Sequence, residues 1–173
     1  MNKIQIQFYK DKNSTLILGS FEDKLCLLDF KYRDLRNAID ARLKSKLKAD
    51  FVEANNPILD KTKEQLDQYF SLQRVQFEIP LLMVGTEFQQ QVWRQLLNIP
   101  YGKTTSYLAL AKAIKRPKAV RAVANANRAN ALSIIIPCHR VIGHDGKLMG
   151  YGGGLTVKKQ LLELESIADR GLS

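Results

Sequence analysis

A cysteine, a histidine and an arginine stand side by side at Cys138, His139 and Arg140, directly after Pro137 and a run of isoleucines. Cysteine attacks as its thiolate, and a neighbouring base or positive charge allows a thiolate to form near neutral pH. The commonest role of a cysteine outside a disulfide is that of a small buried apolar residue, and Cys26, which lies among leucines, fits that role. Because the polar pair after Cys138 would be costly to bury without partners, the sequence favours a reactive Cys138 over a structural one.

The net positive charge of the chain lies mainly in its second half, where acidic residues are few. The net charge is +10, from 27 Lys and Arg against 17 Asp and Glu, and no acidic residue occurs anywhere in 88–144. Neutralisation of phosphates supplies most of the sequence-independent affinity for nucleic acid, so a segment of one sign indicates a polyanionic partner. The alternative is that the excess Lys and Arg only keep the protein in solution.

The composition also excludes several classes of protein. No apolar run approaches the length of a membrane span, and the N-terminus lacks the apolar core of a signal peptide. The chain has only 2 cysteines, in unlike contexts, which does not indicate a disulfide framework. We therefore expect a cytoplasmic protein with no membrane partner, and a monomer by default.

Residues 1–84 are expected to form an α/β domain. Its expected role is that of a scaffold, because this half offers no set of catalytic side chains. Alternating and continuous apolar patterns predict strands, and apolar residues three or four apart predict helices. The expected strands are 4–8, 15–19, 25–30 and 75–79, and the expected helices are 32–47 and 57–72.

Residues 85–173 are expected to form a second domain with a helix-turn-helix. Thr86 is suited to cap a helix that ends near Ile99, residues 104–106 open a second helix, and Pro117 suits the first turn of a third that ends near Arg128. The third helix is rich in small and basic residues, which is typical of a helix presented to DNA. A plain helical hairpin is the alternative. A last helix is expected over 155–168.

The run Pro137-Cys138-His139-Arg140-Val141 resembles the active-site signature of the O6-alkylguanine-DNA alkyltransferases. Further segments match the same family, namely 88–93, 99–107, 117–123 and 128–130. The similarity covers about Thr86 to Glu165, while the first half is similar mainly in length and element order. The resemblance implies a ribonuclease H-like first domain, with a small antiparallel sheet and helices, and a mainly α, winged helix-turn-helix second domain.

The resemblance also implies a catalytic set. Cys138 corresponds to the alkyl acceptor, His139 to the base that takes the thiol proton through a water, and Glu165 to the carboxylate that orients His139. Asn130 corresponds to the asparagine that braces the active-site turn, and Tyr107 to the tyrosine that contacts the flipped guanine and its phosphate. Spacing alone would make Glu165 a solvated surface acid, so its assignment depends on the resemblance.

Other positions correspond to the DNA interface and the alkyl pocket. Arg121 corresponds to the arginine that fills the place vacated by the flipped base, and the carbonyl of Val141 to the one that reads the guanine amino group. Tyr151 corresponds to a pocket wall, and Gly152 replaces a frequent serine, so only its backbone N–H can donate to the guanine oxygen. The remaining expected DNA-binding residues are Lys118, Ala122, Arg128, Thr104 and Ser106, and Pro137 completes the pocket.

No cofactor is expected, and a zinc in the first domain is not expected either, because that half has only Cys26 and no histidine. The resemblance implies DNA repair by direct reversal, in which an alkyl group passes stoichiometrically and irreversibly from O6-alkylguanine in double-stranded DNA to Cys138. The base is flipped out for this reaction. Activity on O4-alkylthymine stays open.

Two other classes of function remain as alternatives. A non-enzymatic damage sensor or winged-helix regulator would bind DNA without alkyl transfer, but the sensors of this family lack the reactive cysteine. A hydrolase with a Cys-His-Glu set would need a route for water, and nothing in the sequence indicates a peptide or ester site.

Overall fold

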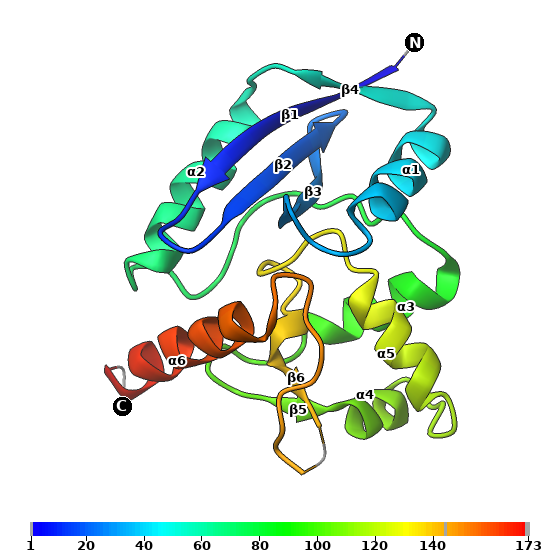
Figure 1. The fold of residues 1–173 in the computed structure, drawn as a ribbon, viewed down its shortest axis with the longest axis vertical. Coiled ribbons are helices and arrows are strands. Elements are labelled where there is room, and N and C mark those ends of the chain that lie inside the picture. Colours follow the sequence, from blue (N-terminus) through cyan, green and yellow to red (C-terminus); the bar gives the residue numbers. More distant parts are fainter. Residues whose placement is uncertain (1, 144, 172–173) are drawn as a thin grey trace. The chain divides into compact units, whose positions relative to one another are not determined.

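The computed structural model describes residues 2–143 and 145–171, and the chain divides into two compact units, Met1–Val84 and Gly85–Ser173. The course of the chain is drawn in Figure 1. Among the described residues, no helix is both long and apolar enough to cross a membrane.

The first unit is built on a four-stranded sheet in the order β3-β2-β1-β4. Its strands are β1 (Asn2–Lys10), β2 (Thr15–Phe21), β3 (Lys24–Phe30) and β4 (Ala49–Glu53). Strands β1, β2 and β3 are antiparallel as predicted, and a tight turn with positive φ at Glu22 and Asp23 joins the last two. The apolar side chains of β2 and β3 are buried almost throughout and form the core of the unit.

Strand β4 was not predicted, and it makes the sheet mixed because it pairs parallel to β1. A parallel neighbour requires a crossover, which α1 (Arg36–Leu47) supplies. β4 has a short apolar pair, Phe51 and Val52, flanked by acids, so it lacks the pattern of a core strand. Helix α1 begins four residues after the predicted start at residue 32, because Leu35 adopts a left-handed conformation.

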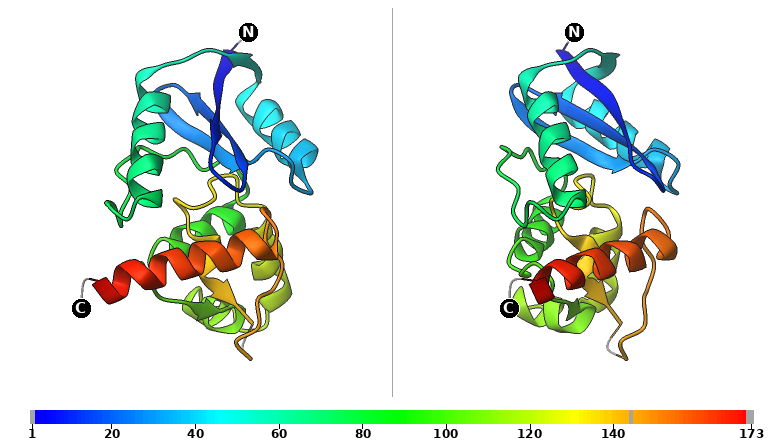
Figure 2. Two further views of the ribbon diagram at one scale, coloured as in Figure 1. Left: turned by 60° about the vertical axis from the view of Figure 1, so that its left-hand side comes forward. Right: turned by 90° about the vertical axis from the view of Figure 1, so that its left-hand side faces the viewer.

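The strand predicted over 75–79 is wrong, since this segment has no regular structure. The side chain of Gln65 accepts from the N–H of Glu78 at 2.8 Å and donates to its carbonyl at 3.4 Å, so a side chain takes the place of a strand partner. Gln65 lies on α2 (Pro57–Phe70), which begins as predicted, with Asn56 capping it and Pro57 in the first turn. Helix α2 runs alongside the sheet in Figures 1 and 2.

The second unit is mainly helical, with a short parallel pair of strands. Its elements are α3 (Glu87–Leu96), β5 (Thr105–Ser106), α4 (Tyr107–Ala113), α5 (Val120–Arg128), the 3₁₀ turn η1 (Cys138–Arg140), β6 (Val141–Ile142) and α6 (Leu155–Gly171). Thr86 caps α3 through a reciprocal capping box with Gln89, as the sequence predicted for its start. The indole of Trp93 on α3 donates to the carbonyl of Ala126 on α5 at 2.8 Å, which anchors α5 on α3.

Helices α4 and α5 pack against each other as the predicted helix-turn-helix. Pro117 lies in the turn before α5 rather than in its first turn, because the helix begins at Val120 with Ala119 as its N-cap. The turn is set by Lys115, which has a φ of 62°, and by the N–H of Arg116, which donates to the carbonyl of Ala111 at 2.9 Å. This left-handed residue ends α4 in the way glycine usually ends a helix.

Candidate active site

The turn η1, called the nucleophile turn after the role that the sequence predicts for Cys138, is buried and braced by hydrogen bonds. Cys138 begins η1 with only 4% of its surface exposed. The amide of Asn130 donates to the carbonyl of Ile136 at 2.9 Å, and its oxygen accepts from the N–H of Leu132 at 2.9 Å. These two bonds close the loop that carries the cysteine, and they hold Ile134 in a left-handed conformation that β-branched residues rarely adopt. Asn130 therefore lies against the turn that carries Cys138.

His139 and Glu165 form a buried pair beside the cysteine. Nε2 of His139 lies 2.7 Å from Oε2 of Glu165, and the two residues are 0% and 1% exposed. An ionised carboxylate only accepts hydrogen bonds, so Nε2 carries the proton and Nδ1 carries the lone pair. Nδ1 is buried and has no hydrogen-bond partner among the described residues, which leaves that lone pair available as a proton acceptor.

Arg140 bonds to the same carboxylate and so forms a buried cluster with His139 and Glu165. Its Nε donates to Oε1 of Glu165 at 2.8 Å, its Nη2 to Oε2 at 3.1 Å, and its Nη1 to the carbonyl of Ile99 at 2.7 Å. Burial by itself would raise the pKa of Glu165, but the hydrogen bonds and charges of His139 and Arg140 lower it to about 2. Glu165 is therefore a carboxylate throughout the physiological range, and it is not the surface acid that its spacing alone would suggest.

Burial lowers the pKa of His139 below its ordinary value, with Arg140 and Lys158 acting in the same direction and Glu165 opposing them. A neutral imidazole with one nitrogen fixed on a carboxylate is the form that accepts a proton from a thiol. The structure thus brings Cys138, His139 and Glu165 together in an arrangement suited to thiolate formation.

Lys158 is a site residue that the sequence analysis missed. Its side chain is 0% exposed, and its Nζ donates to the carbonyl of Val141 at 2.6 Å and to that of Met149 at 2.9 Å. Burial lowers the pKa of Lys158 to about 8, and the negative charge of Cys138 opposes that shift. The available signal was the seven-residue spacing from Lys158 to Glu165, which puts both on one face of α6.

Asn127 was also missed. It lies on α5 and is 4% exposed, and its amide donates to the carbonyl of Cys138 at 3.4 Å. The contact joins the second helix of the helix-turn-helix to the nucleophile turn. Nothing in the sequence signalled it, because an asparagine among alanines is equally compatible with an exposed helix face.

The other predicted pocket residues lie around this centre. Tyr107 is the first residue of α4, and burial followed by the negative charge of Cys138 raises its pKa, so its hydroxyl stays protonated as a donor. The ring of Tyr151 meets that of His139 edge-on, with centroids 6.4 Å apart. Pro137 and Val141 are buried on either side of η1, and Gly152 is half-buried in the turn before α6.

The predicted DNA-binding residues are mostly exposed, as a surface that meets DNA requires. Arg121 and Ala122 lie on the exposed face of α5, and an alanine there leaves room for a close backbone approach. The other exposed members are Thr104, Lys118 and Arg128. Ser106 differs, because its hydroxyl accepts from the N–H of Ala109 at 3.0 Å and so caps α4.

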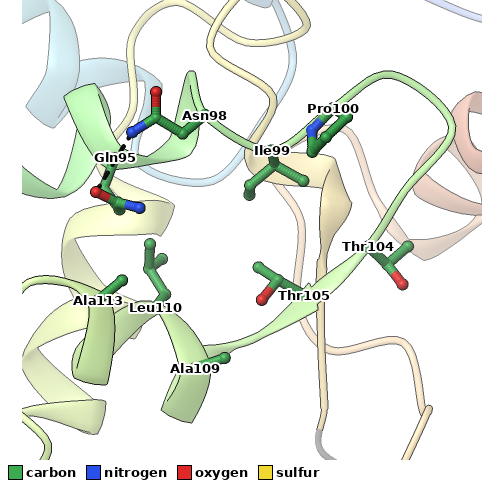
Figure 3. Close-up of a pocket in the computed structure, with 9 residues that line it drawn as sticks. All are labelled: Gln95, Asn98, Ile99, Pro100, Thr104, Thr105, Ala109, Leu110 and Ala113. Atoms are coloured by element: carbon green, nitrogen blue, oxygen red, sulfur yellow. Dashed lines mark hydrogen bonds between the residues drawn. The ribbon is translucent and has the colours of Figure 1, made fainter.

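A surface pocket of about 250 Å³ lies between α3, β5 and α4. Figure 3 shows its lining, in which Gln95 and Asn98 stand opposite Thr104 and Thr105. Of the predicted site residues only Thr104 lines it, so the pocket is separate from the cysteine centre. In the described part of the chain, no group of three or more His, Cys, Asp or Glu residues is placed to hold a metal ion.

Comparisons with known proteins agree with both units. The family model for the DNA-binding domain of 6-O-methylguanine DNA methyltransferase matches residues 87–167, and the model for its ribonuclease-like domain matches residues 8–83. These matches confirm the predicted fold classes.

Individual relatives carry the same family name. A methylated-DNA–protein-cysteine methyltransferase of Methanosarcina barkeri is 42% identical over 150 residues, which cover 87% of this chain and 89% of that protein. The one of Mycobacterium leprae is 56% identical over 101 residues, which cover 58% of this chain and 61% of that protein. The crystal structure of Mycobacterium tuberculosis OGT in complex with DNA is 36% identical, covers 96% of this chain and 94% of that one, and has a TM-score of 0.80.

Proposed function

Since the chain belongs to the 6-O-methylguanine DNA methyltransferase family, we propose that it repairs double-stranded DNA by moving the alkyl group of an O6-alkylguanine onto Cys138. The observation that carries this proposal is the buried 2.7 Å contact between His139 and Glu165 next to the cysteine. A damage sensor that only binds DNA would need neither a nucleophile nor a base fixed beside it.

The chemistry is an in-line displacement at the saturated alkyl carbon. The thiolate of Cys138 forms the new S–C bond, the C–O bond to guanine breaks, and the electron pair remains on the guanine. Tyr107, protonated and half-buried, is placed to donate toward the developing negative charge. Nδ1 of His139 takes the proton of the Cys138 thiol. Glu165 fixes the orientation of the imidazole ring through its contact with Nε2.

The product explains why each molecule acts once. The bond formed is a thioether, which water does not hydrolyse under mild conditions. The protein is therefore consumed stoichiometrically. This argues against a cysteine hydrolase, which would need its Cys-His-Glu set to be regenerated in every cycle.

Recognition requires the base to leave the duplex, at a cost of a few kcal/mol. Arg121 on the exposed face of α5 is the side chain proposed to fill the vacated place. The acid-free segment 88–144, with Lys118 and Arg128 exposed, supplies the phosphate contacts. The solved complex of the Mycobacterium tuberculosis relative with DNA supports a DNA partner, and we propose the cytoplasm as the place of action.

Mass spectrometry of the protein after mixing with a duplex that contains O6-methylguanine tests the proposal. One methyl group on the peptide with Cys138, formed with a one-to-one stoichiometry, is the expected result. A bound but unmodified protein would support the sensor, and product released in many turnovers would support the hydrolase.

A further inference from the structure

Asn127 is a buried asparagine on the helix that is expected to meet DNA. Only 4% of its surface is exposed, and it lies in the last turn of α5. Its amide nitrogen donates to the carbonyl of Cys138 at 3.4 Å, while its Oδ1 is buried and has no partner in residues 2–143 and 145–171. The protein thus engages only the donor half of this amide. Because a half-paired buried amide does little for stability, its contact with Cys138 calls for a functional explanation.

Two asparagine amides hold the backbone at and just before the nucleophile. The carbonyl of Ile136 accepts from the N–H of Cys138 at 2.7 Å and from the amide of Asn130 at 2.9 Å. The carbonyl of Cys138 accepts from the N–H of Val141 and from the amide of Asn127. A carbonyl oxygen has two lone pairs, so both carbonyls are fully engaged. Each is held once by the backbone of the turn and once by a side chain from outside it.

The segment between these two carbonyls is constrained as well. Pro137 has a φ of −80° and a ψ of 63°, which together with the bond from the N–H of Cys138 to the carbonyl of Ile136 forms an inverse γ-turn. The proline ring fixes φ, and the carbonyl of Pro137 accepts from the N–H of Arg140 at 3.0 Å. The turn is therefore internally rigid, and the freedom left to it is movement as a unit relative to the helices around it.

The two asparagines differ in what they join to the turn. Asn130 lies beyond the C-cap of α5, in the connection that leads to the turn. Asn127 lies inside α5, so through it the helix itself holds the backbone of Cys138. The same helical turn is fixed to α3, because the carbonyl of Ala126 accepts from the indole of Trp93 at 2.8 Å. Asn127 thus extends a fixed helix to the nucleophile.

Helix α5 also carries predicted DNA-binding residues. Arg121 and Ala122 lie on its exposed face, and Asn127 follows Arg121 by six positions, which is about 9 Å along the axis of an α-helix. The backbone hydrogen bonds of the helix keep this distance constant. A duplex docked on the exposed face therefore has a defined position relative to the carbonyl of Cys138.

We propose that Asn127 is a positioning residue for alkyl transfer. It fixes the nucleophile turn to the DNA-binding helix, so that the sulfur of Cys138 keeps its place relative to a guanine presented by the docked duplex. The inference deepens the proposed function and rests on it, because it concerns the same nucleophile and the same DNA surface. In this role Asn127 acts through the backbone of Cys138 rather than on the sulfur or the base.

The test compares two substitutions of Asn127 with the wild-type protein. Asn127→Ala removes the amide, and Asn127→Leu removes it but keeps the branching of the side chain and fills the space. Asn125→Ala, at an exposed position of the same helix, is the matched control. Three quantities are measured for each protein: the single-turnover rate of transfer from a saturating O6-methylguanine duplex, the Kd for that duplex, and the rate of reaction with free O6-methylguanine.

We expect the saturated rate on duplex to fall about tenfold in both Asn127 variants, because a small displacement of the reacting atom is enough for such a loss. The Kd should stay within about twofold of wild type, since the exposed face of α5 is unchanged. The rate with the free base should fall by less than about threefold, because a free base enters the pocket without being held by α5. Asn125→Ala should keep the wild-type saturated rate.

Chemical denaturation of the Leu variant separates positioning from a purely structural role. Asn127→Leu replaces a half-paired buried amide with an apolar side chain, so its midpoint of unfolding should be above that of Asn127→Ala and close to that of the wild type. Its transfer should nevertheless remain slow. A transfer rate that recovers together with the stability would make Asn127 a structural residue only and would overturn the proposal.

Two further outcomes would also overturn it. One is an unchanged saturated rate on duplex in a folded Asn127 variant, and the other is an equal loss on duplex and on the free base. The proposed function is tested separately, by methyl transfer to Cys138 in the wild-type protein. If the wild type transfers the methyl group and both Asn127 variants are equally fast, this inference fails while the repair activity stands.

Discussion

The two cysteines lie in regions that are equally buried but chemically opposite. Cys26 is 1% exposed within β3, among leucines, and its thiol donates to the carbonyl of Gly19 at 3.6 Å. Cys138 is 4% exposed and is followed by His139 and Arg140, which both bond to Glu165. Burial raises the pKa of Cys26 to about 12, and a backbone hydrogen bond opposes this shift only in part.

The comparison of the two cysteines indicates that burial alone does not decide whether a thiol is chemically unreactive. Around Cys26 the buried neighbours in the sequence are leucines, and desolvation outweighs the backbone hydrogen bond that favours the thiolate. In the second unit the core contains charged groups, with Glu165 bonded to His139 and Arg140 and with Lys158 bonded to two backbone carbonyls. The reactive thiol therefore depends on a polar network that the rest of the fold has to hold in place.

Cys138→Ala is the substitution with the largest expected effect on the difference between the two cysteines. We expect complete loss of alkyl transfer with unchanged binding to duplex DNA, because the acceptor atom is gone while the surface of α5 is intact. Mass spectrometry of the treated protein and a binding titration check the two halves. Transfer retained in this variant, with the alkyl group on Cys26, would refute the assignment of the nucleophile.

Glu165→Gln tests the network that separates the two regions. Loss of the carboxylate frees the His139 ring to change tautomer and leaves Arg140 without its anion, so we expect transfer to slow by about 10²-fold. Single-turnover kinetics on an O6-methylguanine duplex measure the effect. Glu165→Asp, which keeps the charge at a shorter reach, serves as the companion, and an unchanged rate in the Gln variant would rule out the relay.

The Glu165→Gln variant should also differ from the wild type in how its free energy of unfolding depends on pH. The pKa of Glu165 is about 2 in the folded protein, below its ordinary value, so the carboxylate stabilises the fold above about pH 4.5 and this contribution is lost as the pH falls toward 2. The contribution amounts to about 3 kcal/mol. We expect a flatter acid limb in the Gln variant, seen by denaturant unfolding between pH 3 and 7, whereas the wild-type slope retained in full would contradict the low pKa.

Arg121→Ala tests whether repair of duplex DNA also depends on the predicted DNA-binding surface of the second unit. If Arg121 offsets about 1.4 kcal/mol of the flipping cost, repair of duplex should slow about tenfold, while reaction with the free alkylated base is unchanged. Arg94→Ala, which removes a charge from an exposed position on α3, is the matched control. Equal losses on duplex and free base would exclude the flipping role.

Cys26→Ala gives the smallest expected effect. Removal of one buried sulfur from a well-packed strand should lower the free energy of unfolding by about 1 kcal/mol. Alkyl transfer should be unchanged, since Cys26 belongs to the other unit. Chemical denaturation and the transfer assay measure the two quantities, and a slower transfer in this variant would mean that the units are coupled.

The sequence by itself determined the elements that depend on local signals. Thr86 predicted the start of α3, the spacing of apolar residues after Pro57 predicted α2, and the pattern of small and basic residues predicted the helix-turn-helix. The juxtaposition of Cys138 and His139 also indicated a reactive thiol, because adjacent residues share a neighbourhood in any fold.

Only the tertiary structure decided what depends on contacts between distant residues. Strand β4 exists because β1 offers it an edge, and 75–79 is no strand because Gln65 takes its backbone groups. Glu165 and Lys158 are residue types that usually lie at the surface, and their burial follows from how α6 packs on η1. A charge that is desolvated by packing and balanced by a partner elsewhere in the chain has no local signature, so the electrostatics of the site were beyond what the sequence alone provides.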